Sequence, residues 1–111
     1  MTDLTRQTCT PCAPGTPPMD ADAVRAGLAA LPDWTLSDDG RAIVRRIEVK
    51  GFARAVQLAN VAAWLGERQG HHPDVRFGWG YCEVAFTTHA AGGPTRNDLI
   101  CAARLDALLG P

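Results

Sequence analysis

The spacing of apolar residues alternates between two periods along this chain, and that alternation most constrains the fold. Apolar residues recur every three or four positions in about 20–31, 52–65 and 99–109, which is the period of a helix with one buried face. They recur at every second position in 43–49 and 75–88, which is typical of strands. The pattern therefore predicts three helices separated by two pairs of strands.

Turn residues indicate that each pair of strands is a hairpin. Asp38-Asp39-Gly40 stands within the first hairpin sequence, residues 34–49, and Gly78-Trp79-Gly80 stands within the second strand region, and both sequences favour tight reversals. Antiparallel hairpins joined by helices make an α+β domain. We predict a four-stranded antiparallel sheet with three helices packed on one face, in the order α-β-β-α-β-β-α.

The first 18 residues differ from the rest of the chain. They are rich in Pro, Thr and Gly and have almost no apolar side chains. A segment of this composition cannot bury enough apolar surface to become ordered by itself. We predict a flexible N-terminal arm over residues 1–18 and one domain over residues 19–111, and we expect a chain starting near Met19 to fold and function. Cys9 and Cys12 have the C-x-x-C spacing of zinc sites, but no second such pair follows, so we predict no metal.

Charge and composition exclude several classes of partner. The 111 residues include 11 basic and 12 acidic side chains, so a net charge of −1 offers no electrostatic footprint for nucleic acid or an anionic membrane. No apolar run approaches the roughly 20 residues of a membrane span, and the first residues lack the apolar segment of a secretory signal. We predict a cytoplasmic protein with no nucleic-acid or membrane partner, and its cysteines as thiols.

All three histidines lie at the open end of the second predicted hairpin. His71 and His72 precede its first strand and His89 follows its second strand, so the hairpin should bring them together. Pro73 restricts His72 to extended backbone angles, and consecutive side chains of an extended segment point opposite ways. At most one of the adjacent pair should therefore face His89 directly. Imidazoles grouped in this way either ligate a metal or transfer protons.

With these residues in view, the chain resembles the pterin-4a-carbinolamine dehydratases over about residues 20–109. The resemblance rests on the spacing of several single residues and on three short motifs. These are Glu67, His71-His72-Pro73, Trp79, His89 and Asp98, together with "PDW" ending at Trp34, "TTH" at 87–89 and "GGPTRND" at 92–98. Residues 19–111 are accordingly identified as a pterin carbinolamine dehydratase-like domain.

The resemblance implies a reaction, a site and an assembly. Members remove water from 4a-hydroxytetrahydropterin, which an aromatic amino acid hydroxylase releases, to give quinonoid dihydropterin without a metal or an organic cofactor. It implies His71 and His89 as the main acid and base, with His72 binding or assisting, and a homodimer or homotetramer. The substrate-binding residues that it implies are Trp34, Glu67, Pro73, Thr87, Thr88 and Asp98.

Each of these assignments has a simpler alternative. Glu67 reads equally as a solvated position on a helix, Thr87 and Thr88 as ordinary strand residues, and Asp98 as a helix cap following Thr95. Some members of the superfamily act as dimerisation cofactors of transcription factors or as assembly factors for other enzymes. A non-catalytic binding module is therefore the alternative function.

Overall fold

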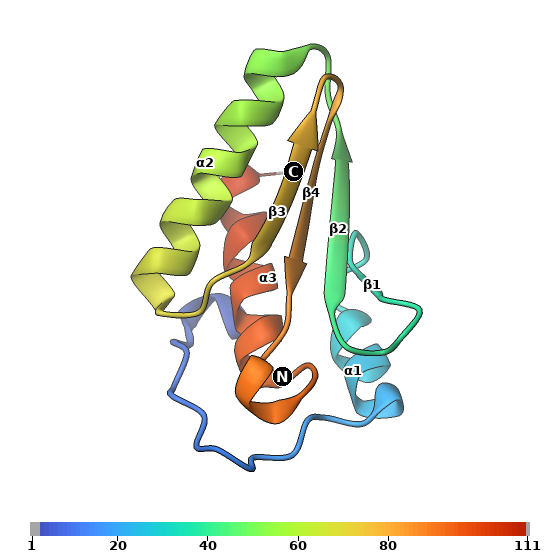
Figure 1. Ribbon diagram of the computed structural model, residues 1–111, viewed down its shortest axis with the longest axis vertical. Coiled ribbons are helices and arrows are strands. Elements are labelled where there is room, and N and C mark those ends of the chain that lie inside the picture. Colours follow the sequence, from blue (N-terminus) through green and yellow to red (C-terminus); the bar gives the residue numbers. More distant parts are fainter. Residues whose placement is uncertain (1–2, 111) are drawn as a thin grey trace.

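Two antiparallel hairpins form the sheet of this protein, and helices precede, separate and follow them (Figure 1). The computed structural model describes residues 3–110. The helices are α1 (Ala21–Leu28), α2 (Phe52–Gln69) and α3 (Arg96–Leu109), with short 3-10 helices at Leu4–Arg6 and His89–Ala91. The strands are β1 (Thr35–Leu36), β2 (Ile43–Glu48), β3 (Asp74–Gly78) and β4 (Tyr81–Phe86). The predicted α+β fold and its order of elements are confirmed.

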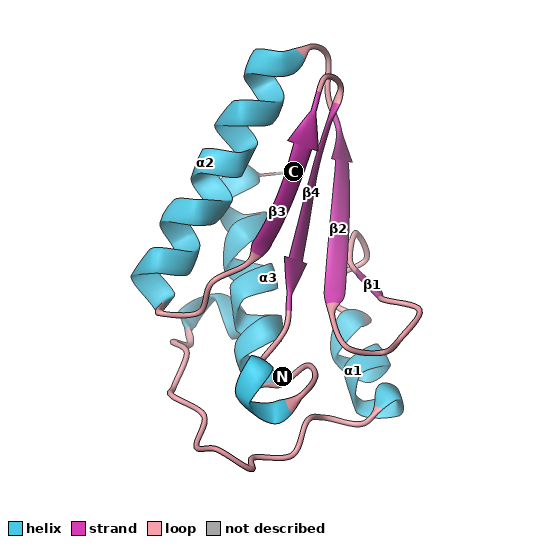
Figure 2. Ribbon diagram, viewed as in Figure 1, coloured by secondary structure: helices cyan, strands magenta, loops and turns pink. Residues whose placement is uncertain are grey.

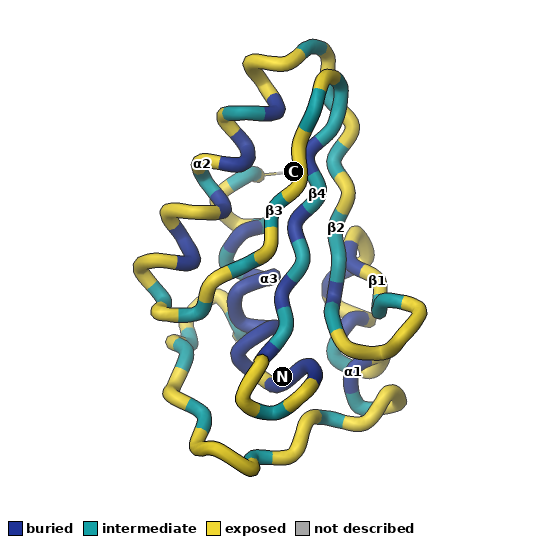
Figure 3. Tube along the Cα trace, viewed as in Figure 1, coloured by how far each residue is buried: buried dark blue, intermediate teal, exposed yellow. Residues whose placement is uncertain are grey.

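The sheet has the order β1-β2-β4-β3, so β4 lies inside it and joins the two hairpins. β2 pairs with β4 from Ile43 opposite Phe86 to Glu48 opposite Tyr81. The three helices cover one face (Figure 2). Burial alternates along β4, so that Val84 and Phe86 point into the core, as the period of two predicts (Figure 3).

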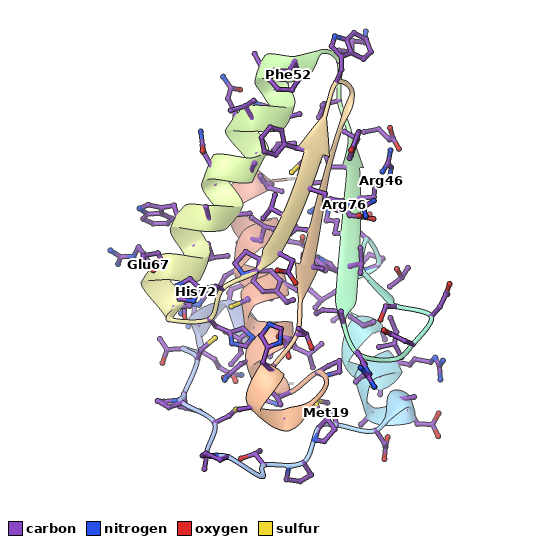
Figure 4. The ribbon with its side chains drawn as sticks, viewed as in Figure 1. Met19, Arg46, Phe52, Glu67, His72 and Arg76 are labelled. Carbon is purple, nitrogen blue, oxygen red and sulfur yellow. The ribbon has the colours of Figure 1, made fainter. Side chains whose placement is uncertain are left out.

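The other face of the sheet carries charged side chains. Arg46 of β2 and Arg76 of β3 both stand opposite Glu83 of β4, and the Arg76 guanidinium lies 3.4 Å from the Glu83 carboxylate. Figure 4 shows Arg46 and Arg76 on the strands at this face. These pairs keep the outer face polar while the helices enclose the inner one.

The first helix is shorter than its apolar spacing predicts. The Asp20 carboxylate accepts a hydrogen bond from the backbone N–H of Ala23 and caps α1, as expected. The helix ends at Leu28 rather than at Leu31, because a turn follows in which the Leu31 N–H donates to the Leu28 carbonyl. Leu31 stays buried in this turn, so the apolar spacing continues past the end of the helix.

The N-terminal arm runs along one end of the molecule, from beside α3 to the start of α1 (Figure 1). Leu4 and Cys9 pack against the core, and the carbonyl of Gln7 accepts a 2.6 Å hydrogen bond from Nε of Arg104. Composition did not indicate these contacts, because several of them use the main chain of the arm, which every residue type supplies. The division of the chain at residue 18 and the flexibility of the arm stay predictions.

None of the helices within residues 3–110 combines the length and the apolar content that a membrane span requires.

Candidate functional site

The connection between α2 and β3 is folded tightly against the helix that precedes it. Gly70 ends α2 in the left-handed region, with a φ of 63°, and the N–H of His71 donates to the Gly66 carbonyl. A Cβ at Gly66 would lie 2.5 Å from Cδ of Pro73, so the glycine lets the loop approach. This close approach fixes where His71 and His72 leave the backbone.

His71 points into the domain. Its side chain is 12% exposed, and its Nε2 lies 2.5 Å from Oδ1 of Asp98 on α3. Its ring is stacked on Phe86 of β4, with 6.2 Å between ring centroids. The carboxylate of Asp98 raises the pKa of His71 above its ordinary value, although partial burial opposes that effect. The structure thus favours a protonated His71 at neutral pH.

Asp98 is fully buried and has two functions. Its Oδ2 accepts hydrogen bonds from the N–H of Thr95 at 2.7 Å and from the hydroxyl of Thr88 at 2.8 Å. With the Thr95 side chain it forms a capping box at the start of α3, so the capping interpretation is confirmed. Its other oxygen contacts His71, which the capping interpretation did not include.

His72 points away from the domain, as the alternation of an extended segment predicts. Its Nε2 lies 2.7 Å from Oε1 of Glu67, and both side chains are mostly exposed. Figure 4 shows these two residues together at the end of α2. Glu67 therefore orients His72, but a pair this exposed to water is weak.

His89 completes the group from the other side of the hairpin. It begins the short 3-10 helix that follows β4, and its side chain is exposed. Within residues 3–110, no hydrogen-bond partner contacts its ring nitrogens. All three histidines line one cavity of about 520 Å³. The predicted convergence at the open end of the hairpin is thus present in the structure.

The other predicted site residues divide into two groups. Pro73, Thr87 and Thr88 line the cavity with the histidines. Glu67 and Asp98 do not line it, and each contacts a histidine that does.

Trp34 belongs to neither group. It is buried in the core, its ring lies against Phe86, and its Nε1 donates a 2.9 Å hydrogen bond to Asp106. Because Trp34 does not line the cavity, the geometry gives no support to its predicted contact with a ligand.

Sequence reasoning missed the contribution of the arm to this cavity. Residues 9–12 line it, as do Gln69 at the end of α2 and Asn97 in the first turn of α3. The side chain of Asn97 is buried and bonds to the main chain of Thr10. A polar amide on the apolar side of a predicted helix was the available signal, because such a group requires a hydrogen-bond partner.

The chemistry that this arrangement supports is proton transfer. It combines one imidazole whose protonated form a buried carboxylate favours with two exposed imidazoles that line the same cavity. Such a set can donate one proton and accept another from a single ligand. In the part of the chain that the structure describes, no three His, Cys, Asp or Glu side chains are grouped so as to hold a metal ion.

Comparison with known proteins identifies relatives of this chain. Residues 17–108 match the family described as "Pterin 4 alpha carbinolamine dehydratase". A protein of Paracoccus denitrificans, named "Putative pterin-4-alpha-carbinolamine dehydratase", is 54% identical over 96 residues, which are 86% of this chain and 90% of that protein. A Methylococcus capsulatus protein of the same name is 41% identical over 105 residues, covering 95% of this chain and 92% of its own.

Solved structures show the same fold. A Brucella melitensis protein described as a transcriptional coactivator/pterin dehydratase superposes with a TM-score of 0.76 at 28% identity, over 84% of this chain and 99% of that one. A pterin dehydratase-like protein, described as a RuBisCO assembly factor in the alpha-carboxysome, gives a TM-score of 0.58 at 24% identity. It covers 70% of this chain and 90% of its own, and at this identity it supports the fold alone.

Proposed function

This chain belongs to the pterin-4a-carbinolamine dehydratase family, and we propose that it removes water from a 4a-hydroxytetrahydropterin to give the quinonoid dihydropterin. In this reaction the bond between C4a and its hydroxyl oxygen breaks, and the oxygen leaves as water after taking a proton. The adjacent ring nitrogen loses its proton, and the electron pair of that N–H bond forms the new C=N bond. The reaction requires an acid and a base on one ligand.

His71 is the proposed acid. Its contact with Asp98 stabilises the imidazolium and raises the pKa of His71, which favours the protonated form that a donor requires. Asp98 is itself fixed by Thr88 and by the start of α3, and the ring is held against Phe86. An acid held in one orientation donates more effectively than one that must first be ordered.

His89 is the proposed base. It lines the cavity from the opposite side of the hairpin and is exposed, with no carboxylate bonded to it within residues 3–110. His72 lines the same cavity and is oriented by Glu67, and we assign it to binding or to assisting proton transfer. Thr87 and Thr88, at the cavity wall, are proposed to contact the edge of the pterin.

The observation that carries the proposal is the placement of His71, bonded to buried Asp98, in one cavity with the other two histidines. The pterin would come from an aromatic amino acid hydroxylase in the same pathway. We further propose that the protein works in the cytoplasm as a homodimer or homotetramer, without a metal or an organic cofactor.

The test generates the carbinolamine in situ with a phenylalanine hydroxylase and follows its decay by ultraviolet absorbance. The unaided dehydration sets the background, and general acid or base catalysis typically adds 10²–10⁴-fold per group. Wild type should accelerate the decay, and His71→Ala and His89→Ala should each lose most of that acceleration. The double variant should lose little more than the worse single one, because acid and base act on the same step.

A non-catalytic binding role is the second candidate, supported by the Brucella melitensis relative that is described as both coactivator and dehydratase. A fold of this kind does not by itself fix one function. If wild type leaves the decay rate unchanged while circular dichroism shows a folded protein, the dehydratase assignment is refuted and the binding module replaces it.

A further inference from the structure

We propose that residues 9–12 of the N-terminal arm form a wall of the pterin pocket, and that Asn97 is the positioning residue that holds this wall in place. The inference rests on the proposed function for the identity of the ligand. The arm residues line the same cavity as His71, His72 and His89. The wall therefore comes from a segment that lies about 60 residues before His71 and His72 in the sequence, and farther still before His89.

Asn97 pairs with the arm through both ends of its side-chain amide. Its Oδ1 accepts a 3.0 Å hydrogen bond from the N–H of Thr10, and its Nδ2 donates a 2.7 Å hydrogen bond to the carbonyl of the same residue. The side chain is 7% exposed, so these bonds are shielded from water. Two bonds to one residue fix both the position and the orientation of the arm there.

Further contacts anchor the arm directly before this point. The N–H of Cys9 donates a 3.0 Å hydrogen bond to Oε1 of Gln69, the last residue of α2. The Cys9 sulfur lies 3.5 Å from the sulfur of Cys101, a buried residue one turn beyond Asn97 on α3. The arm is thus attached to both helices that end or begin at the cavity.

The wall should act on binding rather than on chemistry. The proposed acid and base, His71 and His89, belong to the domain, and so does Asp98. Residues 9–12 contain neither a carboxylate nor an imidazole, so they supply contact area and exclude water from one side of the ligand. Loss of the wall should therefore raise KM and Kd while kcat is retained.

Two variants release the arm by independent routes. Asn97→Ala removes the amide, and Asn60→Ala on the exposed side of α2 is its matched control. Because Asn97 is buried and its loss can also affect folding, Thr10→Pro provides a second route. It removes the Thr10 N–H that donates to Oδ1 of Asn97 and changes no residue of the domain.

The first measurement reports the position of the arm without reference to activity. In a Cys12→Ser background, diamide takes two electrons and two protons from the thiols of Cys9 and Cys101 as their S–S bond forms. Peptide mapping should then find tryptic residues 7–25 joined to 97–104. The disulfide should form readily when residue 10 is Thr, and equally in Thr10→Ala, which keeps both main-chain hydrogen bonds to Asn97. It should form about tenfold more slowly in Thr10→Pro or Asn97→Ala.

The second measurement is the affinity for 7,8-dihydrobiopterin, a stable reduced pterin, by isothermal titration calorimetry. We expect Kd to rise about tenfold in Asn97→Ala and Thr10→Pro, and to stay unchanged in Asn60→Ala. Loss of the cross-link with an unchanged Kd would overturn the proposal, because the arm would then lie beside the ligand without binding it. If wild type binds the probe and the two variants bind it weakly, the role of the arm in binding is supported even when the dehydration assay shows no acceleration.

Discussion

Replacing Asp98 by Asn tests the proposed acid most directly, because the substitution keeps the shape of the side chain and removes its charge. The amide oxygen can still accept from Thr95 and Thr88, which preserves the cap of α3. The amide NH₂ would then face Nε2 of His71, and two donors cannot bond to each other. His71 must lose its proton to accept that bond, so its pKa falls.

The cost to stability depends on pH. Because the pKa of His71 is raised in the folded protein, the stabilisation from its contact with Asp98 is fully present below the ordinary histidine value. It is lost as pH rises through the raised pKa. Hydrogen bonds to charged groups contribute about 1.5–3 kcal/mol, so Asp98→Asn should lower the free energy of unfolding by about 2 kcal/mol at pH 6. The difference from wild type should shrink towards pH 9.

The cost to catalysis should be greater near neutral pH. Loss of a general acid removes about 10²-fold of the acceleration, and the alkaline limb of the pH–rate profile should move to lower pH because His71 deprotonates earlier. Urea unfolding at several pH values and the carbinolamine decay assay measure the two effects. Asp106→Asn, another aspartate of α3, is the control: its contacts with Arg45 and Trp34 should cost stability without moving the pH profile. Full activity of Asp98→Asn with an unshifted alkaline limb would refute the reasoning.

Other predictions follow from single contacts. Trp34→Phe removes the N–H that donates to Asp106 and should cost about 1 kcal/mol in denaturant unfolding, with KM unchanged because the ring lies outside the cavity; a higher KM would restore Trp34 to the binding site. Gly66→Ala should destabilise by about 1–3 kcal/mol in the same measurement, because its Cβ would clash with Pro73; unchanged stability would show that the loop moves away at little cost. β3 leaves a sheet edge unpaired by any strand of residues 3–110, so light scattering at micromolar concentration should return the mass of a homodimer or larger assembly; a monomer mass would contradict this.

The fold and the grouping of the histidines were predictable because both follow from local periodicity. A period of two with a tight turn specifies a hairpin, and a hairpin brings residues before its first strand to residues after its second. That reasoning placed His71 and His89 at one end of the sheet without any knowledge of the helices. The opposite directions of His71 and His72 followed from Pro73 in the same way.

Contacts between helices and loops were harder to predict, because spacing along one element does not specify what another element presents to it. The spacing identified Asp98 as a cap but did not show that its second oxygen meets His71. The motif around Trp34 suggested a ligand contact, whereas Asp106, distant in sequence, bonds its indole N–H. The arm was judged by its few apolar side chains, whereas the main chain of Thr10 makes the bonds to Asn97.

The dual use of the Asp98 carboxylate has a consequence for how this fold diverges. A descendant released from selection for dehydration can replace an exposed imidazole such as His89 at little structural cost. It cannot replace Asp98 so freely, because the same side chain holds the start of the last helix. Among related sequences, lineages that have abandoned the chemistry should therefore be recognised by lost histidines beside a retained aspartate.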